Sequence, residues 1–254
     1  MPASVFQGVI VGGAYGTGRE VVEYVSRHGP LGGFLACLVI AISFSLILAT
    51  GFAFAQRFEI RNYRHFLKAL LGPAWIVYEI LFILLLIVVL AVVGSAAGEM
   101  FKEHLDFPYW AGVGSVFAIV VLLGFFGRDR VEQSLVIWTI ALMLCLLLLI
   151  VYVVSAEMPT IRHNFNAPSN FGEAVVHGFQ FSLYNSALVP VLIYCTGGIQ
   201  TQRQAVASGV IAGIFGALPA LLLHVTFIAH YPLIVEQALP VYAVLETLER
   251  QFPI

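Results

Sequence analysis

Long runs of apolar residues constrain this chain more than any other feature of its sequence. A helix needs about 20 apolar residues to cross a hydrocarbon layer of about 30 Å. Five runs reach about this length, at 31–54, 73–98, 109–127, 131–155 and 205–230. Because 60% of the residues are hydrophobic and only 10% are charged, a water-soluble domain would expose large apolar surfaces. We therefore expect an all-α, polytopic transmembrane bundle.

Two further segments, 4–28 and 174–200, are long enough to cross but contain small and polar residues near their middles. Four glycines fall within Gly12–Gly18, and each costs roughly 1 kcal/mol relative to alanine in a helix. In the second segment, Pro190 cannot donate to the carbonyl of Ser186, which weakens the helix there. We expect both helices to be discontinuous, which gives seven crossings in all.

The basic residues divide unevenly between the two sets of loops that seven alternating crossings create. Most of them lie in the loops at 55–72, 127–131 and 199–204, whereas the other set is rich in acidic residues. The positive-inside rule places the first set and the N-terminus in the cytoplasm, and hence the protein in the inner (cytoplasmic) membrane. Residues 57–72 also have the apolar and basic faces of an amphipathic helix on an anionic leaflet, with a solvated loop as the alternative.

The first break is a candidate binding site. In hydrocarbon a non-helical patch is tolerated only inside protein or beside a water-filled cavity. A second half-helix starting at Arg19 would direct its N-terminal amides at an anionic guest, although the glycines could instead let another helix pack closely. Arg19, Glu20 and Glu23 favour a functional break because lipid-facing charges are expensive, yet Arg19 and Glu23 are also spaced to pair. The candidate substrate-binding residues here are Gly12, Gly13, Ala14, Tyr15, Gly16, Thr17 and Gly18.

Polar side chains also gather at the second break. Gln180, Tyr184, Asn185 and Ser186 could bind a ligand, or could form hydrogen bonds between helices. The candidate coupling or gating residues are Arg19, Glu20, Glu23 and Glu79. For Glu79, early in the span 73–98, snorkelling toward the cytoplasmic interface is the alternative. Two discontinuous helices, each followed by further crossings, are typical of inverted-repeat secondary transporters with a site near the midplane.

The run from Gly12 to Val25 resembles the first helix of the YkvI family of poorly characterised bacterial membrane proteins, whose pattern is approximately G-x-G-F-A-S-G-Q-E. Tyr15 stands for the usual Phe, and Arg19 for the usual Gln. Further matches are Gly94-Ser95-Ala96, Phe107–Trp110, Gly124–Gly127 and Tyr184-Asn185. That family is similar to amino acid–polyamine–organocation transporters with the LeuT fold. The resemblance implies five-plus-five inverted repeats and a site between the first, third, sixth and eighth helices, to which Ser95 would belong.

On this resemblance the chain is an incomplete pair of repeats. Residues 1–155 would form the first repeat of five helices, 156–173 an extracellular loop, 174–230 two helices of the second repeat, and 231–254 an extracytoplasmic surface segment leading to a missing eighth helix. We expect a truncated form of a longer transporter, the alternative being a shortened form completed by association. LeuT-type symporters hold sodium between the first and eighth helices, so the coupling ion, Na⁺ or H⁺, stays open. Arg19 could replace that ion or recruit an anionic substrate.

The expected function is secondary-active transport of a small organic solute, such as an amino acid or similar zwitterion, by alternating access. A membrane-embedded sensor or receptor subunit that binds a solute without moving it is the alternative. An enzyme is not expected, because no HExxH, GxSxG or paired-Asp motif accompanies His177, His224 and His230. We expect no cofactor and no metal. The expected partners are the lipid bilayer and a solute, with an oligomer left open; a net charge of −2 gives no basic excess for nucleic acid.

Overall fold

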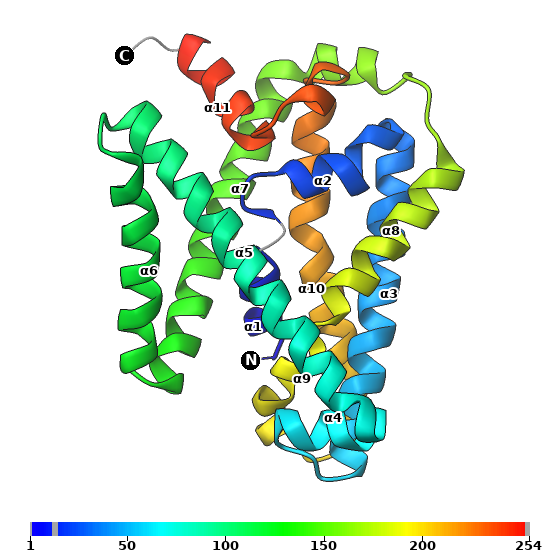
Figure 1. Cartoon of the computed structure of the whole chain (residues 1–254). Helices are drawn as coiled ribbons and strands as arrows, with labels where there is room; N and C mark the ends of the chain where they lie inside the picture. The colour runs from blue at the N-terminus through cyan, green and yellow to red at the C-terminus, as the bar shows by residue number, and fades with distance from the viewer. Residues whose placement is uncertain (1, 12–14, 252–254) are drawn as a thin grey trace. The chain divides into compact units, whose positions relative to one another are not determined.

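The structure is a computed structural model that describes residues 2–11 and 15–251. Within this part of the chain it contains helices and no strand, so the predicted all-α bundle is confirmed there (Figure 1). Four helices among the described residues are long and apolar enough to cross a membrane. A fifth apolar helix, α6 (Tyr109–Phe125), is shorter. All five apolar runs of the sequence are therefore helical.

The chain divides into two compact units, which are described separately. The first consists of Met1–Tyr63 with Trp138–Ile254, and the second of Arg64–Ile137. The long helix α7 (Arg128–Asn164) begins in the second unit and ends in the first. Both candidate helix breaks belong to the first unit.

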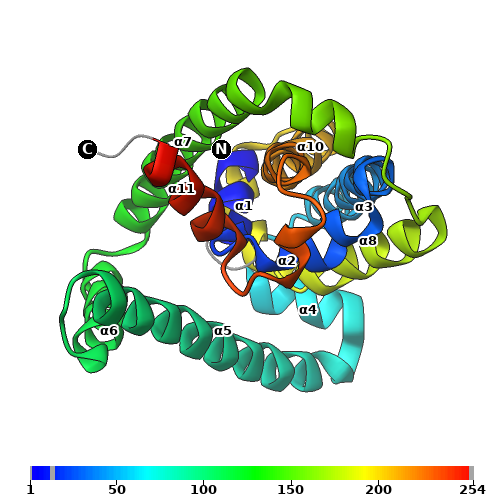
Figure 2. The ribbon, with the colours of Figure 1, turned by 90° about the horizontal axis from the view of Figure 1, so that it is seen from above.

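The core of the first unit is the pair α3 (Pro30–Arg57) and α10 (Gln202–Ile228). A Cβ added at Gly209 or at Gly213 would lie 2.3 Å from a backbone nitrogen of α3, so only glycine permits this close approach. Gly178, on α8, also lies close to α3, where an added Cβ would be 2.9 Å from the carbonyl oxygen of Ala36. Figure 2 shows α1 and α3 on different sides of α10. Small residues thus bring these helices together without a driving force from water, as is usual in membranes.

The first interrupted helix consists of α1 (Pro2–Ile10), α2 (Arg19–Tyr24) and the 3₁₀ turn η2 (Ser26–His28). Residues 16–18 are bends, and Gly18 has a φ of 77°, a left-handed conformation that favours glycine. The predicted interruption within 4–28 is confirmed. Its second half is short, and α2 runs across rather than along α3 and α10 (Figure 1). Gly12, Gly13 and Ala14 lie outside the described residues.

The second interrupted helix consists of α8 (Phe171–Ser186), α9 (Val189–Leu192) and η4 (Ile193–Gly198). Ala187 and Leu188 form the turn between them, and their amides donate three residues back instead of four. Because Pro190 has no N–H, the helix tightens here, as predicted, but it does not unwind into an extended segment.

The segment 156–173, expected as an extracellular loop, is helical as far as Asn164 in α7 and again from Phe171 in α8. The helix kinks at Glu157, which has non-helical φ and ψ values, and Pro159 then lies in the first turn of the final stretch. Asn164 donates through Nδ2 to the carbonyls of Ile228 and Ala229 at 2.9 and 3.3 Å. This contact fixes the end of α7 against the end of α10, which sequence alone could not reveal.

The surface segment expected at 231–254 contains η5 (Leu233–Glu236) and an amphipathic helix, α11 (Pro240–Gln251). Figure 2 shows α11 and α2 at the same end of the first unit, near the viewer. The amide of Val241 donates to the carbonyl of Thr17 at 3.3 Å. The segment therefore contacts the first break directly.

The second unit is built from α4 (Tyr63–Leu71), η3 (Gly72–Ala74), α5 (Trp75–His104), α6 and the start of α7. The short α4 confirms the amphipathic helix predicted within 57–72. The helices α5 and α6 pack near the turn that joins them, where a Cβ added at Gly112 would lie 2.4 Å from a carbonyl of α5. Many large apolar side chains of α5 and α6 are exposed, as expected for surfaces that contact lipid.

Candidate functional site at two interrupted helices

The two interrupted helices of the first unit cross in opposite directions. The segment before the first break, α1, lies against α9 and η4, which follow the second break. The segment after the first break, α2, lies against α8, which precedes the second break. We name residues 15–20 and 184–190, which are the two breaks with the helical residues beside them, the paired breaks. The arrangement places side chains from two segments more than 160 residues apart in one site.

Tyr15 anchors the first break. Its side chain is 3% exposed, and its hydroxyl donates to the carbonyl of Gly216 on α10 at 3.0 Å. Its ring stacks on that of Phe181 on α8, with 5.7 Å between the ring centres. A buried tyrosine needs a hydrogen-bond partner, and Tyr15 finds one that holds it between two helices.

Side chains of the protein itself fill part of the space beside the bend at residues 16–18. Gly16 is exposed, but a Cβ added at Gly18 would lie 2.8 Å from the side chain of Val241 and 2.9 Å from that of Phe227. The amide of Arg19, the first residue of α2, donates to the hydroxyl of Thr17 at 3.3 Å. Since α2 has six residues and this amide is paired, its N-terminus is a weaker anion site than the sequence predicted.

Glu20 and Tyr184 join the two interrupted helices. The hydroxyl of Tyr184 donates to Oε1 of Glu20 at 3.5 Å. The other carboxylate oxygen, Oε2, is buried and has no hydrogen-bond partner among the described residues. A buried acceptor without a donor is costly, so this oxygen is available to a donor from outside the chain.

The other candidates on α8 bond within their own helix. Asn185 is buried and donates through Nδ2 to the carbonyl of Phe181 at 2.9 Å, and the hydroxyl of Ser186 donates to the carbonyl of Leu183. Gln180 is exposed. Such bonds to the preceding turn bend a helix, so Asn185 and Ser186 contribute to the shape of the second break.

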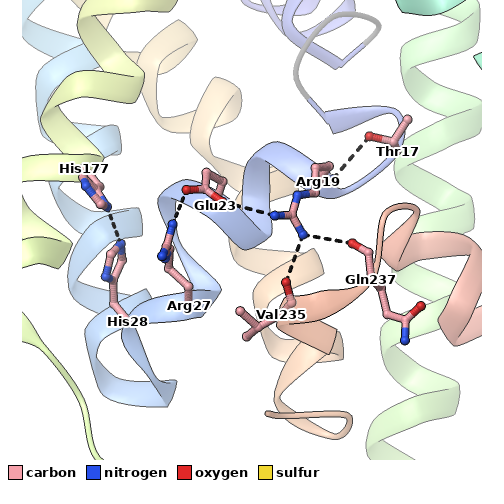
Figure 3. Close-up of polar contacts among 8 residues, drawn as sticks. All are labelled: Thr17, Arg19, Glu23, Arg27, His28, His177, Val235 and Gln237. Atoms are coloured by element: carbon pink, nitrogen blue, oxygen red, sulfur yellow. Dashed lines mark hydrogen bonds and ion pairs between the residues drawn. The ribbon is translucent and has the colours of Figure 1, made fainter. Parts of the chain in front are cut away.

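Arg19 and Glu23 form a chain of polar contacts along α2 (Figure 3). The Nη2 of Arg19 lies 3.4 Å from Oε2 of Glu23, which also pairs with Arg27. The Nη1 of Arg19 donates to the carbonyls of Val235 and Gln237 at 2.9 and 3.0 Å. Arg19 therefore pairs with Glu23, one of the two alternatives above, and it also ties α2 to the segment before α11.

Glu79 and Ser95 belong to the second unit. Glu79, on α5, accepts from Nη2 of Arg64 at 3.4 Å, which fits the interpretation of a carboxylate near an interface. Ser95 accepts from the hydroxyl of Tyr109 on α6 at 3.2 Å. Both contacts are confined to their own unit.

The sequence interpretation missed a histidine pair, His28 and His177. Nε2 of His28 and Nδ1 of His177 are 2.9 Å apart, between η2 and α8 (Figure 3). The signal was available: His28 ends the first interrupted segment, and His177 lies near the start of the second, which runs in the opposite direction. These two ends must meet if the segments are antiparallel.

His224 and His230, the other two histidines considered in the sequence, each form hydrogen bonds within the protein. His224 is buried on α10, with Nε2 2.9 Å from the carbonyl of Pro30 and Nδ1 2.9 Å from the hydroxyl of Ser26. His230 lies 3.2 Å from the hydroxyl of Thr247. No group of three or more potential metal ligands occurs in the part of the chain that the structure describes.

One known protein is similar to part of this chain. It is the uncharacterized membrane protein YkvI of Bacillus subtilis (strain 168), which is 30% identical over 112 residues. The match covers 44% of this chain and 32% of the relative, so the chain matches about a third of the relative's length. No protein-family model matches the chain, and no solved structure matches it. The relative's name and the apolar helices agree that this is a membrane protein, similar to YkvI.

Proposed function

We propose that this protein is a secondary-active transporter of a small organic solute, and that the paired breaks form its solute site. The observation that carries the proposal is the polar contact between the two interrupted helices, where Tyr184 donates to Glu20. A carboxylate with one unpaired buried oxygen is expensive in a membrane protein unless it serves a ligand or an ion.

The antiparallel crossing of the interrupted helices supports a LeuT-like inverted repeat. In such transporters the two discontinuous helices are related by a two-fold axis in the membrane plane and meet at the substrate. Here α1 lies against α9, and α2 against α8, which is the pairing that such an axis produces. The membrane would be the inner membrane, with the N-terminus in the cytoplasm.

The proposed substrate class is an amino acid or a similar zwitterion. An ammonium group is a strong donor, and Oε2 of Glu20 is a buried acceptor that lacks a donor among the described residues. Tyr184 orients the same carboxylate from the other helix. The exposed backbone at Gly16 would face the substrate's carboxylate. Alternating access would follow from exchanging the Tyr184–Glu20 contact for contacts with the solute.

The first test is thermal unfolding of the purified 254-residue chain in detergent against a panel of amino acids and organic acids, with and without sodium. A bound solute raises the unfolding temperature by mass action. The stabilising solute is then measured for counterflow in proteoliposomes. Glu20→Gln should abolish both effects for an amine-containing solute, whereas Glu99→Gln, on the exposed surface of α5, should leave both unchanged.

The outcomes separate the candidate functions. Stabilisation together with counterflow supports transport. Stabilisation without counterflow indicates a membrane-embedded sensor or receptor subunit and overturns the transport proposal. If Glu20→Gln binds and exchanges the solute as the unmodified protein does, the paired breaks are not the solute site.

A further inference from the structure

The histidine pair lies at a contact between the two interrupted helices. His28 ends η2, and His177 lies two turns into α8. Their rings are 4.7 Å apart between centres, and the nitrogens that face each other are at hydrogen-bond distance, 2.9 Å (Figure 3). The amide of Asn170, which caps α8, also donates to the carbonyl of His28 at 2.9 Å. The pair is therefore held by backbone contacts as well as by its own bond.

His28 is almost completely enclosed, but a surface carboxylate reaches it. Its side chain is 1% exposed, and its second nitrogen, Nδ1, has no hydrogen-bond partner among the described residues. Oε2 of Glu173, on a side chain that is 63% exposed, lies 3.8 Å from this nitrogen. Glu173 thus connects solvent to a buried imidazole that is otherwise sealed.

The other charged and titratable groups around the pair lie on α2, η2, α8 and α10, where His224 bonds to Ser26 of η2. On the side of α2 and η2 these are Glu23 and Arg27, which pair together and influence His28 from a distance. The ring of Tyr24 contacts the ring of His177 edge-on, with 6.3 Å between ring centres. On α8 the carboxylate of Glu173 is the group nearest to His28. Burial and the neighbouring ring of His177 disfavour a positive charge at His28, and Glu173 is the main group that compensates it.

For the two rings to form a hydrogen bond, one of the two facing nitrogens must carry a hydrogen and the other must accept it. When Nε2–H of His28 donates to Nδ1 of His177, Nδ1 of His28 carries a lone pair facing Glu173. A proton that binds Glu173 from solvent can then pass to Nδ1 of His28. The product is an imidazolium that still donates to His177, beside a restored Glu173 carboxylate. One proton enters, and no bond between the two helices is lost in this step.

We propose that Glu173, His28 and His177 form a proton-binding site, and that the proton is the coupling ion of this protein. The proposal rests on the transport function proposed above. The site joins the same two interrupted helices as the Tyr184–Glu20 contact does, but nearer the start of α8. Proton binding turns the neutral hydrogen bond between the two rings into a charged one. The positive charge then needs the carboxylate of Glu173 nearby. Protonation thereby favours the arrangement in which α8 and η2 are in contact.

The direct test is ¹⁵N-histidine NMR of the full chain in lipid nanodiscs across pH, which reports both the tautomer and the charge of each ring. Resonances are assigned with His28→Gln and His177→Gln. The proposal expects His28 to become charged while His177 remains its hydrogen-bond acceptor, and His177→Gln to shift the midpoint of His28. Glu173→Gln should move that midpoint to lower pH, because it removes the compensating anion. Glu236→Gln, on exposed η5, is the matched control and should not move it.

The proposal is overturned if the midpoint of His28 is the same in His177→Gln and in Glu173→Gln as in the unmodified protein. If His28→Gln does not fold, the comparison rests on His177→Gln, since His177 is less buried. A separate arm drives solute uptake into proteoliposomes with a pH gradient. If His177→Gln still takes up the solute and uptake needs only sodium, the proton is not the coupling ion. The proposed transport function would still hold. Absence of counterflow for every solute instead contradicts the transport function, and NMR still decides whether the proton site exists.

Discussion

Tyr184 donates its hydroxyl hydrogen to Oε1 of Glu20 at 3.5 Å and so links α8 to α2. The same two segments also meet through the rings of Tyr24 and Phe181, at 5.5 Å between centres, and through the histidine pair. The contact between the interrupted helices is therefore a mixture of polar and aromatic groups. Polar contacts of this kind can be exchanged for contacts with a solute more readily than close apolar packing can.

Tyr184→Phe tests the role of this hydroxyl. The change keeps the ring, and because the bond is long we expect the free energy of unfolding to change by less than about 1 kcal/mol. Glu20 loses its donor, so affinity for an amine-containing solute should fall about tenfold. Affinity is measured from the solute concentration that gives half-maximal thermal stabilisation. An unchanged affinity would show that the hydroxyl does not orient Glu20.

Gly18→Ala tests the backbone of the first break. Gly18 has a φ of 77°, and an added Cβ would lie within 3 Å of Val241 and Phe227. Both strain and steric overlap act here, so we expect a loss of about 2–4 kcal/mol in the free energy of unfolding, measured with denaturant in detergent. Gly72→Ala is the control, because Gly72 has a φ of 55° and nothing within 4 Å. It should lose only about 1 kcal/mol; equal losses would show that packing against Val241 is loose.

The helices and their interruptions were predictable because their causes are local. The length of the apolar run 31–54 is enough to indicate α3. Glycines or Pro190 weaken a helix whatever packs around it. The kink before Pro159 had the same local signal. The continuation of α7 to Asn164 did not, because it depends on hydrogen bonds to the end of α10.

The partners of the candidate site residues were not predictable for the same reason. Asn185 looks identical in sequence whether it faces a ligand or bonds to its own helix, and the structure shows the second arrangement. The pairing of His28 with His177 spans 149 positions, and its one signal in the sequence was the opposite direction of the two interrupted segments. From the sequence, Arg19 could pair with Glu23 or bind a ligand. In the structure it also binds the carbonyls of Val235 and Gln237, which no local pattern indicated.

Gly213→Ala tests the close packing of α10 on α3. An added Cβ would lie 2.3 Å from the backbone nitrogen of Ser45, and neither helix backbone can give way cheaply. We expect a loss of about 2–3 kcal/mol in the free energy of unfolding. The matched control is Gly114→Ala on α6, where nothing lies within 4 Å, and the higher helix propensity of alanine should raise stability by up to about 1 kcal/mol. Two changes of the same sign and size would mean that α3 and α10 do not pack as described.

Arg19→Gln tests whether Arg19 holds the segment before α11 against the first break. Arg19 donates to the carbonyls of Val235 and Gln237, so its loss should release this segment while leaving α2 in place. Amide hydrogen exchange in residues 233–241, including Val241, which donates to Thr17, should become about tenfold faster. The measurement is hydrogen–deuterium exchange by mass spectrometry in detergent.

Arg27→Gln separates this effect from the loss of a surface charge. Arg27 shares the partner Glu23 with Arg19 but lies beyond α2, and the contacts recorded for it are with Glu23. Exchange in residues 233–241 should therefore be unchanged in Arg27→Gln. If both variants accelerated exchange equally, the cause would be the charge balance around Glu23 rather than the two carbonyl contacts. If neither did, α11 would be held by the Val241–Thr17 bond and the packing of Gly18 alone, and Arg19 would be free to exchange its carbonyl partners for a solute.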